Sequence, residues 1–205
     1  MVLILVPSSL KKGCRSVAGK KVGILALQGD FLEHSEALKK CGAQSIEVRT
    51  PAHLEEVDGL IIPGGESTTI GKLMQANGLD QAIKKQYDAG MPIWGTCAGM
   101  VLLAREIADY EQFSLGLMDV RVKRNAFGRQ INSFETDLEV ADIGKIRGIF
   151  IRAPYVEKTW GNAQILAKYQ DKIVAVEQDH KLLSTAFHPE LTDNREMHDY
   201  FLSML

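Results

Sequence analysis

The chain has 205 residues, of which 45% are hydrophobic and 24% are charged, a composition typical of a globular protein with one sizeable core. Its formal net charge of −2 gives no electrostatic basis for binding nucleic acid or an anionic membrane. No apolar run approaches the roughly 20 residues that span a bilayer.

The first 19 residues differ from the rest of the chain. They are basic, and no acidic residue occurs before Asp30. Their apolar run VLILV is too short for the core of a signal peptide. These residues could be a transit peptide or could result from a start upstream of the natural one. We expect residues 1–19 to be an N-terminal extension outside the fold, and residues 20–205 to form a single domain.

From Lys20 onward, apolar runs alternate with amphipathic stretches. Strands are predicted at 20–30, 45–50, 57–65 and 91–95, and helices at 31–42, 67–90 and 97–108, the second broken near Asn77-Gly78. Nearly all-apolar strands that alternate with helices indicate a parallel sheet covered on both faces.

Beyond about residue 112 the pattern changes to successive strands. They are predicted at 117–125, 133–140, 147–154, 163–170, 172–178 and 182–189, followed by a helix over 193–205. The chain is therefore predicted to be one α/β domain, with a mainly parallel central sheet and added antiparallel strands.

A cysteine stands where a predicted strand meets a predicted helix. Residues 95–99 have the pattern G-x-C-x-G, in which small residues permit the sharp turn that exposes a nucleophile at the edge of a sheet. The start of the next helix favours a thiolate at Cys97, and the N–H of Ala98 would face an oxyanion. A buried, inert cysteine is the alternative.

The segment FHPEL supplies a candidate base. His188 and Glu190 are two residues apart, so their side chains would share a face of an extended segment, which Pro189 favours at His188. We expect Glu190 to orient His188, and His188 to accept the proton of Cys97. A surface histidine in a loop is the alternative. The remaining histidines are expected to be structural or solvated: His34, His53, His180 and His198.

A glycine turn follows the strand predicted at 57–65. Gly64 and Gly65 allow a ligand to approach the backbone closely, and Gly65 could supply a second N–H to an oxyanion. A tight turn capped by Ser67 is the plainer explanation. Both can hold together, because ligands bind at the strand ends of a parallel sheet.

These elements resemble class I, triad-type glutamine amidotransferases, whose fold is a flavodoxin-like α/β sandwich of three layers. The segments PGGEST, RNAFGRQ and FIRAP narrow the resemblance to the glutaminase subunits of pyridoxal 5′-phosphate synthase. The likeness runs in order from about Lys21 to the C-terminus.

The resemblance implies roles for particular residues. The implied set is a triad of Cys97, His188 and Glu190, an oxyanion hole of Gly65 and Ala98, and glutamine contacts from Gly65, Glu66, Ser67, Arg124, Ile151 and Arg152. The chemistry agrees, because an arginine suits the α-carboxylate of glutamine and Glu66 suits its α-ammonium. Without the resemblance, a solvated arginine in a basic patch would be the simpler interpretation of Arg124.

The resemblance also implies an activity and a partner. The chain would hydrolyse glutamine to glutamate and ammonia through a γ-glutamyl thioester, without a metal or organic cofactor. A (β/α)₈-barrel synthase subunit would receive the ammonia in a large hetero-oligomeric complex, in the cytoplasm; the scattered cysteines favour a reducing compartment. A glutaminase subunit of another class I amidotransferase, a γ-glutamyl hydrolase-like enzyme and a non-catalytic docking subunit are the alternatives.

Overall fold

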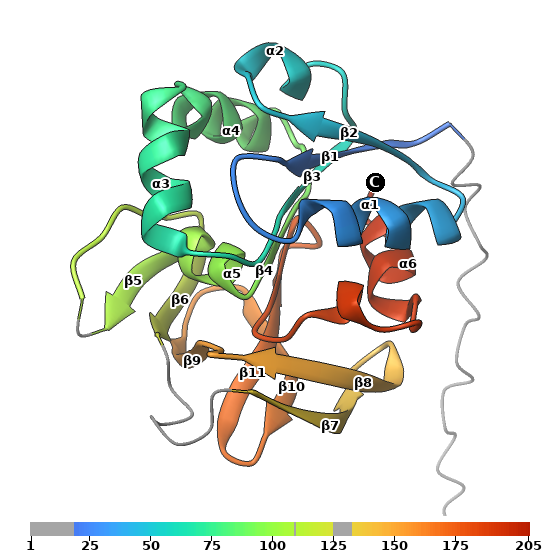
Figure 1. Cartoon of the computed structure of the whole chain (residues 1–205). Helices are drawn as coiled ribbons and strands as arrows, with labels where there is room; N and C mark the ends of the chain where they lie inside the picture. Colours follow the sequence, from blue (N-terminus) through green and yellow to red (C-terminus); the bar gives the residue numbers. More distant parts are fainter. Residues whose placement is uncertain (1–18, 109, 125–132) are drawn as a thin grey trace, which may run out of the picture.

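The computed structural model describes residues 19–108, 110–124 and 133–205 (Figure 1). Its helices are α1 (Phe31–Lys40), α2 (Pro51–Leu54), α3 (Ser67–Ala76), α4 (Leu79–Asp88), α5 (Ala98–Leu103) and α6 (Glu196–Ser203), with a 3₁₀ turn, η1 (Pro189–Leu191). Its strands are β1 (Lys21–Leu25), β2 (Gln44–Val48), β3 (Gly59–Ile62), β4 (Ile93–Thr96), β5 (Ala104–Ala108), β6 (Met118–Lys123), β7 (Ser133–Val140), β8 (Gly144–Ile151), β9 (Tyr155–Thr159), β10 (Ala163–Tyr169), β11 (Lys172–Gln178) and β12 (Leu182–Thr185). Cys14 and the residues predicted as an N-terminal extension, except Gly19, lie outside the described part, as do residues 125–130 of the RNAFGRQ motif.

The main sheet is parallel in its first half and mixed in its second. Its strand order is β2-β1-β3-β4-β12-β11-β9-β6-β5, and β10 pairs with β11. The pairs from β2 to β12 are parallel, whereas β11 is antiparallel to β9, β10 and β12. β7 and β8 form a separate antiparallel hairpin. The predicted parallel core with added antiparallel strands is therefore confirmed.

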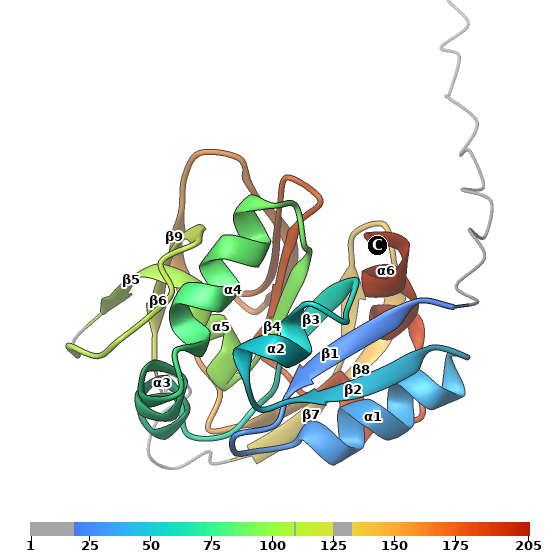
Figure 2. The ribbon, with the colours of Figure 1, turned by 90° about the horizontal axis from the view of Figure 1, so that it is seen from above.

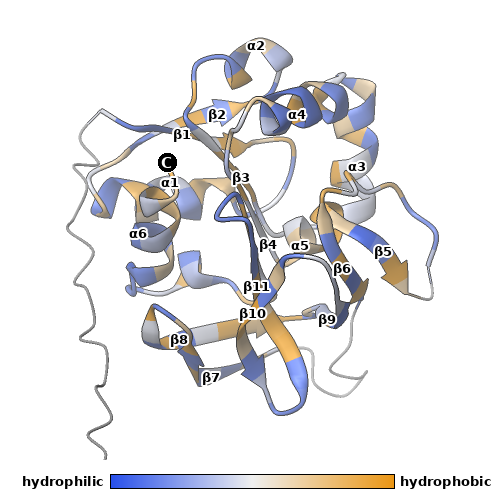
Figure 3. Ribbon diagram, turned by 180° about the vertical axis from the view of Figure 1, so that it is seen from behind, coloured by the Kyte–Doolittle hydropathy of each residue, from blue (hydrophilic) through white to orange (hydrophobic). Residues whose placement is uncertain are grey.

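Helices cover the parallel half of the sheet on both faces. Figures 1 and 2 show α1 and α6 on one side of β1, β3 and β4, and α3, α4 and α5 on the other. β3 and β4 are accordingly buried along their whole length, which explains why their sequences show no polar alternation. In Figure 3 hydrophobic colour marks strand segments such as β10, and hydrophilic colour marks much of α4 at the surface. None of the described helices is long and apolar enough to cross a membrane.

The structure corrects three local predictions. The helix predicted over 97–108 ends at Leu103, because Ala104 turns extended (φ −61°, ψ 142°) and residues 104–108 pair with β6. Pro51 begins the short helix α2 instead of only ending a strand, a position that its fixed φ favours. Strand β9 was not predicted, because only Val156 of its sequence YVEKT is buried and two of its five residues are charged.

The packing of α1 gives a matched stability test. Leu38 is fully buried, whereas Leu32 on the same helix is 58% exposed. We expect Leu38→Ala to lower the free energy of unfolding by about 2–5 kcal/mol, through lost burial and the cavity left behind. Leu32→Ala is expected to change it by less than about 0.5 kcal/mol. Urea denaturation of both variants measures the difference, and equal values would contradict this placement of α1.

Candidate active site

The backbone around Cys97 forms a sharp strand-to-helix turn. Cys97 has φ 47° and ψ −99°, a conformation that L-residues seldom adopt. Its N–H donates to the carbonyl of Thr185 on β12, at 2.8 Å. A Cβ on Gly95 would lie 2.4 Å from the backbone of Gly99, and a Cβ on Gly99 would lie 2.1 Å from the carbonyl oxygen of Ile62. The two glycines of the motif are therefore required by close backbone contacts.

His188 and Glu190 meet beside this turn, as predicted. The Nδ1 atom of His188 lies 2.7 Å from Oε1 of Glu190, and both side chains are buried. Their local structure differs from the prediction, because Glu190 lies in the 3₁₀ turn η1 and not in an extended segment. Pro189 begins that turn at the first position, where a missing N–H costs no hydrogen bond.

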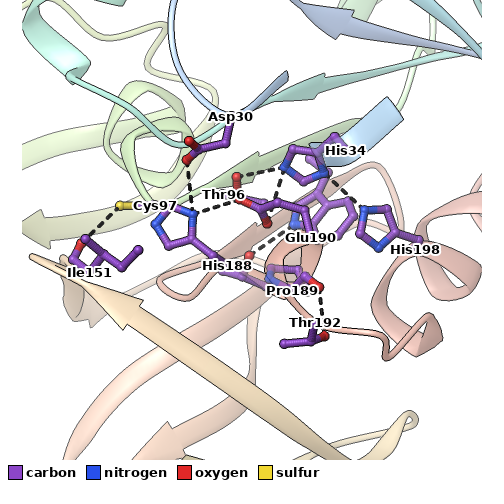
Figure 4. A network of polar contacts seen from close by, with 12 residues as sticks. Asp30, His34, Thr96, Cys97, Ile151, His188, Pro189, Glu190, Thr192 and His198 are labelled. Carbon is purple, nitrogen blue, oxygen red and sulfur yellow. Dashed lines mark hydrogen bonds and ion pairs between the residues drawn. The ribbon is translucent and has the colours of Figure 1, made fainter. Parts of the chain in front are cut away.

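The second ring nitrogen of His188 faces the cysteine. Figure 4 shows this nitrogen, Nε2, turned toward the sulfur of Cys97, and within the described residues it has no hydrogen-bond partner. The Sγ atom of Cys97 also lies 3.8 Å from the carbonyl oxygen of Ile151. Burial would lower the pKa of His188, but its contacts with Asp30, Cys97 and Glu190 together raise it above the ordinary value. These contacts thus favour an imidazolium at His188, beside the sulfur of Cys97.

A second carboxylate faces the same histidine, and sequence reasoning missed it. Oδ2 of Asp30, from the turn after β1, lies 3.4 Å from Nδ1 of His188. The approach depends on Gly64, where a Cβ would lie 2.3 Å from Cε1 of His188 and 2.8 Å from the Asp30 carboxylate. The sequence signal was the segment LQGD at the end of a predicted strand, because parallel strand ends gather at one edge of the sheet.

The predicted substrate residues line one pocket next to the cysteine. Its walls are Gly65, Glu66, Ser67, Cys97, Ala98, Val101, Arg124, Ile151, Arg152 and Pro154. Every residue predicted to contact glutamine or an oxyanion is among them, and Val101 and Pro154 are additions. Arg152 has a left-handed φ of 44°, and Gly65 has a φ of 147°. The pocket therefore joins the turn after β3, the cysteine turn and the end of β8.

Two charged groups of this pocket pair with each other. Nη2 of Arg124 lies 3.0 Å from Oε1 of Glu66, and its Nη1 donates to Oε1 of Gln112 at 2.6 Å. The Arg124 guanidinium also stacks over the ring of Tyr110, 4.8 Å from its centroid. The side chain of Arg124 is 21% exposed and held by these three groups, which does not fit the alternative of a solvated arginine. Gln112 and Tyr110 were not predicted, since neither lies in a recognisable motif.

The other histidines divide into two groups. His53 is partly exposed and lies in α2, where the sequence pattern indicates a turn, whereas His180 is exposed and lies in a turn. His34 on α1 and His198 on α6 are fully buried, and Figure 4 shows both on the side of Glu190 that is away from Cys97.

Comparison with known proteins identifies a family. The profile of the SNO glutamine amidotransferase family matches residues 24–205. The pyridoxal 5′-phosphate synthase subunit PdxT of Desulforamulus reducens is 53% identical over 186 residues, which cover 90% of this chain and 98% of that protein. The PdxT subunit of Desulforudis audaxviator is 54% identical over 187 residues, with coverage of 90% and 98%.

Solved structures with similar folds agree with this family match. One described as a glutamine amidotransferase has a TM-score of 0.86 and 50% identity, and the match covers 89% of this chain and 97% of the other. The structure of PurLQS from Thermotoga maritima has a TM-score of 0.65 at 17% identity, covering 90% of this chain and 97% of the other, and shows likeness of fold alone. These structures confirm the predicted class I amidotransferase-like α/β fold.

Proposed function

The chain belongs to the SNO glutamine amidotransferase family, and from this premise we propose that it is the glutaminase subunit of a pyridoxal 5′-phosphate synthase. The observation that carries the proposal is the single pocket in which Cys97, backed by His188 and Glu190, adjoins the complementary charges of Glu66 and Arg124. Identities of 50–54% to PdxT subunits, against 16–17% to structures of other amidotransferase systems, favour this synthase over the alternatives.

The proposed reaction uses the geometry of the triad. The Cys97 thiolate attacks the side-chain amide carbon of glutamine and forms a C–S bond, while the carbonyl electrons move to its oxygen. The N–H groups of Gly65 and Ala98 are proposed to hold this oxyanion. The C–N bond then breaks, and His188 gives its proton to the leaving ammonia. His188 next removes a proton from water, which displaces the sulfur and releases glutamate.

The pocket suits the backbone end of free glutamine. The α-carboxylate can take the place of Glu66 against the Arg124 guanidinium, and the α-ammonium can take the place of Arg124 against Glu66. Ser67, Ile151 and the side chain of Arg152 complete the proposed contacts. The amide end then reaches Cys97, because the same pocket includes the cysteine.

We further propose the setting of this reaction. Residues 20–205 act as one glutaminase domain in the cytoplasm. The acceptor is a (β/α)₈-barrel synthase subunit in a large hetero-oligomeric complex. It must take up the ammonia through a sheltered path, since ammonia in water at neutral pH becomes ammonium.

The turn from Leu27 to Asp30 is proposed to transmit docking of the synthase. The Asp30 N–H donates to the Gly64 carbonyl oxygen at 3.2 Å, and the Glu66 N–H donates to Oε1 of Gln28 at 2.8 Å. This turn therefore holds the carbonyl oxygen of the peptide between Gly64 and Gly65 and the N–H of the peptide that follows it. Glycines on both sides allow the peptide between Gly64 and Gly65 to rotate by half a turn. Such a flip would replace the Gly65 N–H at the oxyanion hole with a carbonyl oxygen.

The triad gives the first functional prediction. Cys97→Ala is expected to abolish ammonia release from glutamine, and His188→Asn is expected to be about as damaging, because triad members act as a unit. Glu190→Gln is expected to reduce ammonia release less, because Glu190 orients His188 and does not itself transfer the proton. Cys41→Ala is the matched control: burial and the neighbouring Asp199 raise the pKa of that thiol to about 12, so it is unreactive.

An alkylating glutamine analogue distinguishes the two thiols directly. Mass spectrometry is expected to find the label on Cys97. Label on Cys41, or full activity of Glu190→Gln, would contradict the assignment.

The charged contacts give the next prediction. Arg124→Ala and Arg152→Ala are each expected to raise the KM for glutamine, because a charge-assisted contact contributes roughly 1.5–3 kcal/mol. Arg121→Ala is the control, since Arg121 lies on β6 near Arg124 but pairs with Glu157. An unchanged KM in both pocket variants would assign these arginines to packing or docking.

Dependence on the partner gives the last functional prediction. The purified chain is expected to release little ammonia until the synthase is added, because loss of one oxyanion donor costs orders of magnitude in rate. Steady-state ammonia release with and without synthase measures this dependence. Equal turnover would refute the proposed switch and leave the triad assignment unaffected.

A further inference from the structure

A second chain of buried polar groups continues from the triad into the layer of α1 and α6. Nε2 of His34 lies 3.5 Å from Oε2 of Glu190 and 3.2 Å from Oγ1 of Thr96. Its other nitrogen, Nδ1, lies 3.1 Å from Nε2 of His198. Figure 4 shows this line running from Cys97 through His188 and Glu190 to the two histidines. Trp94 packs edge-on against both of their rings.

The two oxygens of Glu190 have unequal surroundings. Oε1 accepts from His188, whereas Oε2 is buried and has no hydrogen-bond partner at ordinary distance among the described residues. The side chains of Glu190 and His34 are both completely shielded from solvent. A carboxylate oxygen buried without a donor is costly, and the ring nitrogen nearest to it belongs to His34.

The protons of the two histidines can be placed by elimination. Burial lowers the pKa of His34 well below its ordinary value and lowers that of His198 to about 3, so both rings are neutral near pH 7. A neutral imidazole has one N–H donor and one acceptor nitrogen. Only two arrangements then satisfy the contact between the rings.

The two arrangements differ at Glu190. If His34 donates through Nδ1, His198 is left with a buried Nδ1–H that has no partner, and Oε2 of Glu190 receives no N–H donor. If His198 donates through Nε2 to His34, the Nε2–H of His34 points to Thr96 and Glu190. The second arrangement leaves only one acceptor lone pair of His198 unused, which costs less than a stranded donor.

We propose that His34 is a positioning residue for the glutaminase reaction, and that its Nε2–H holds Oε2 of Glu190 while His198 fixes its tautomer. The carboxylate is thereby kept in the rotation that presents Oε1 to His188. The charged or titratable groups that face Glu190 are then His188, Asp30 across the His188 ring, and His34. This inference rests on the proposed glutaminase activity.

Substitutions at His34 test the positioning role in the complex with synthase. His34→Leu removes the donor but fills the space, and we expect kcat to fall about tenfold or more with KM nearly unchanged, as for one lost hydrogen bond to a charged group. His34→Gln can place an amide N–H near the former Nε2 and is expected to restore most of the kcat. His180→Leu is the matched control, because His180 is exposed.

The pH profile separates positioning from packing. A donor to Glu190 favours its ionised form, so removing the donor raises the pKa of this carboxyl. The acid limb of the kcat profile of His34→Leu is therefore expected at higher pH than that of the wild type, and His34→Gln should bring it back. A kcat within twofold of wild type in His34→Leu, or equal losses in both variants with an unmoved acid limb, would overturn the proposal.

The histidine tautomers can also be measured on the wild-type chain, which requires neither a folded variant nor catalytic activity. Nitrogen-15 NMR of histidine-labelled protein near pH 7 is expected to show His34 and His198 as neutral rings protonated at Nε2. A proton on Nδ1 of His34, or an imidazolium there, would overturn the proposal. The tautomer is independent of catalysis, so failure of the glutaminase assignment would show separately, as activity retained by Cys97→Ala.

Discussion

A carboxylate is buried at the carboxyl edge of the parallel strands, and the arrangement of the elements around it follows from the need to compensate its charge. The Glu190 side chain is shielded from solvent, and burial raises its pKa above the ordinary value although the contact with His188 opposes this shift. His188 supplies one donor from the segment before η1, and the ring nitrogen of His34, on α1, that we propose as the second donor lies 3.5 Å from Oε2. Because an unpaired buried charge would cost several kcal/mol, α1 and η1 are tied to each other through this group. Apolar packing of α1 alone would not fix which helix face meets the triad.

A steric constraint places the reactive sulfur on the other side of this carboxylate. The turns after β3 and β4 approach so closely that glycine is needed at Gly64, Gly95 and Gly99. Each of these close approaches brings a functional group into place: Gly64 lets His188 and Asp30 meet, and Gly99 lets α5 begin directly beside β3. The strained φ of Cys97 is tolerated because its N–H is held by β12. The same strand leads, a few residues later, to His188, so nucleophile and base are positioned from one strand pair.

Sequence reasoning predicted the parts of this site that depend on local pattern. The G-x-C-x-G turn, the glycine turn and the HPE segment each have a short signature, and strand ends of a parallel sheet gather at one edge. It missed the parts that depend on tertiary packing. His34 and His198 are 164 residues apart in the chain, and nothing in either helix indicates that they meet. The helix predicted over 97–108 failed for the same reason, because pairing with β6 overrides the helical preference of residues 104–108. Because the ends of parallel strands gather at one edge, the sequence could have placed Asp30 near the site, but it could not show which way the side chain faces.

The pairing of Glu66 with Arg124 bears on how strongly free glutamine can bind. In the structure the two side chains satisfy each other at 3.0 Å, so the substrate's charged end replaces an existing ion pair and gains only the difference between the two sets of contacts. The gain in rate must come instead from contacts made as the oxyanion forms, at the N–H groups proposed for Gly65 and Ala98. Under the proposed assignment, binding and catalysis use different parts of one pocket: the charged pair would select an amino acid, and the glycine turn would determine whether its amide reacts. On this proposal, a synthase that acts on the turn from Leu27 to Asp30 would change turnover without changing which substrate is bound.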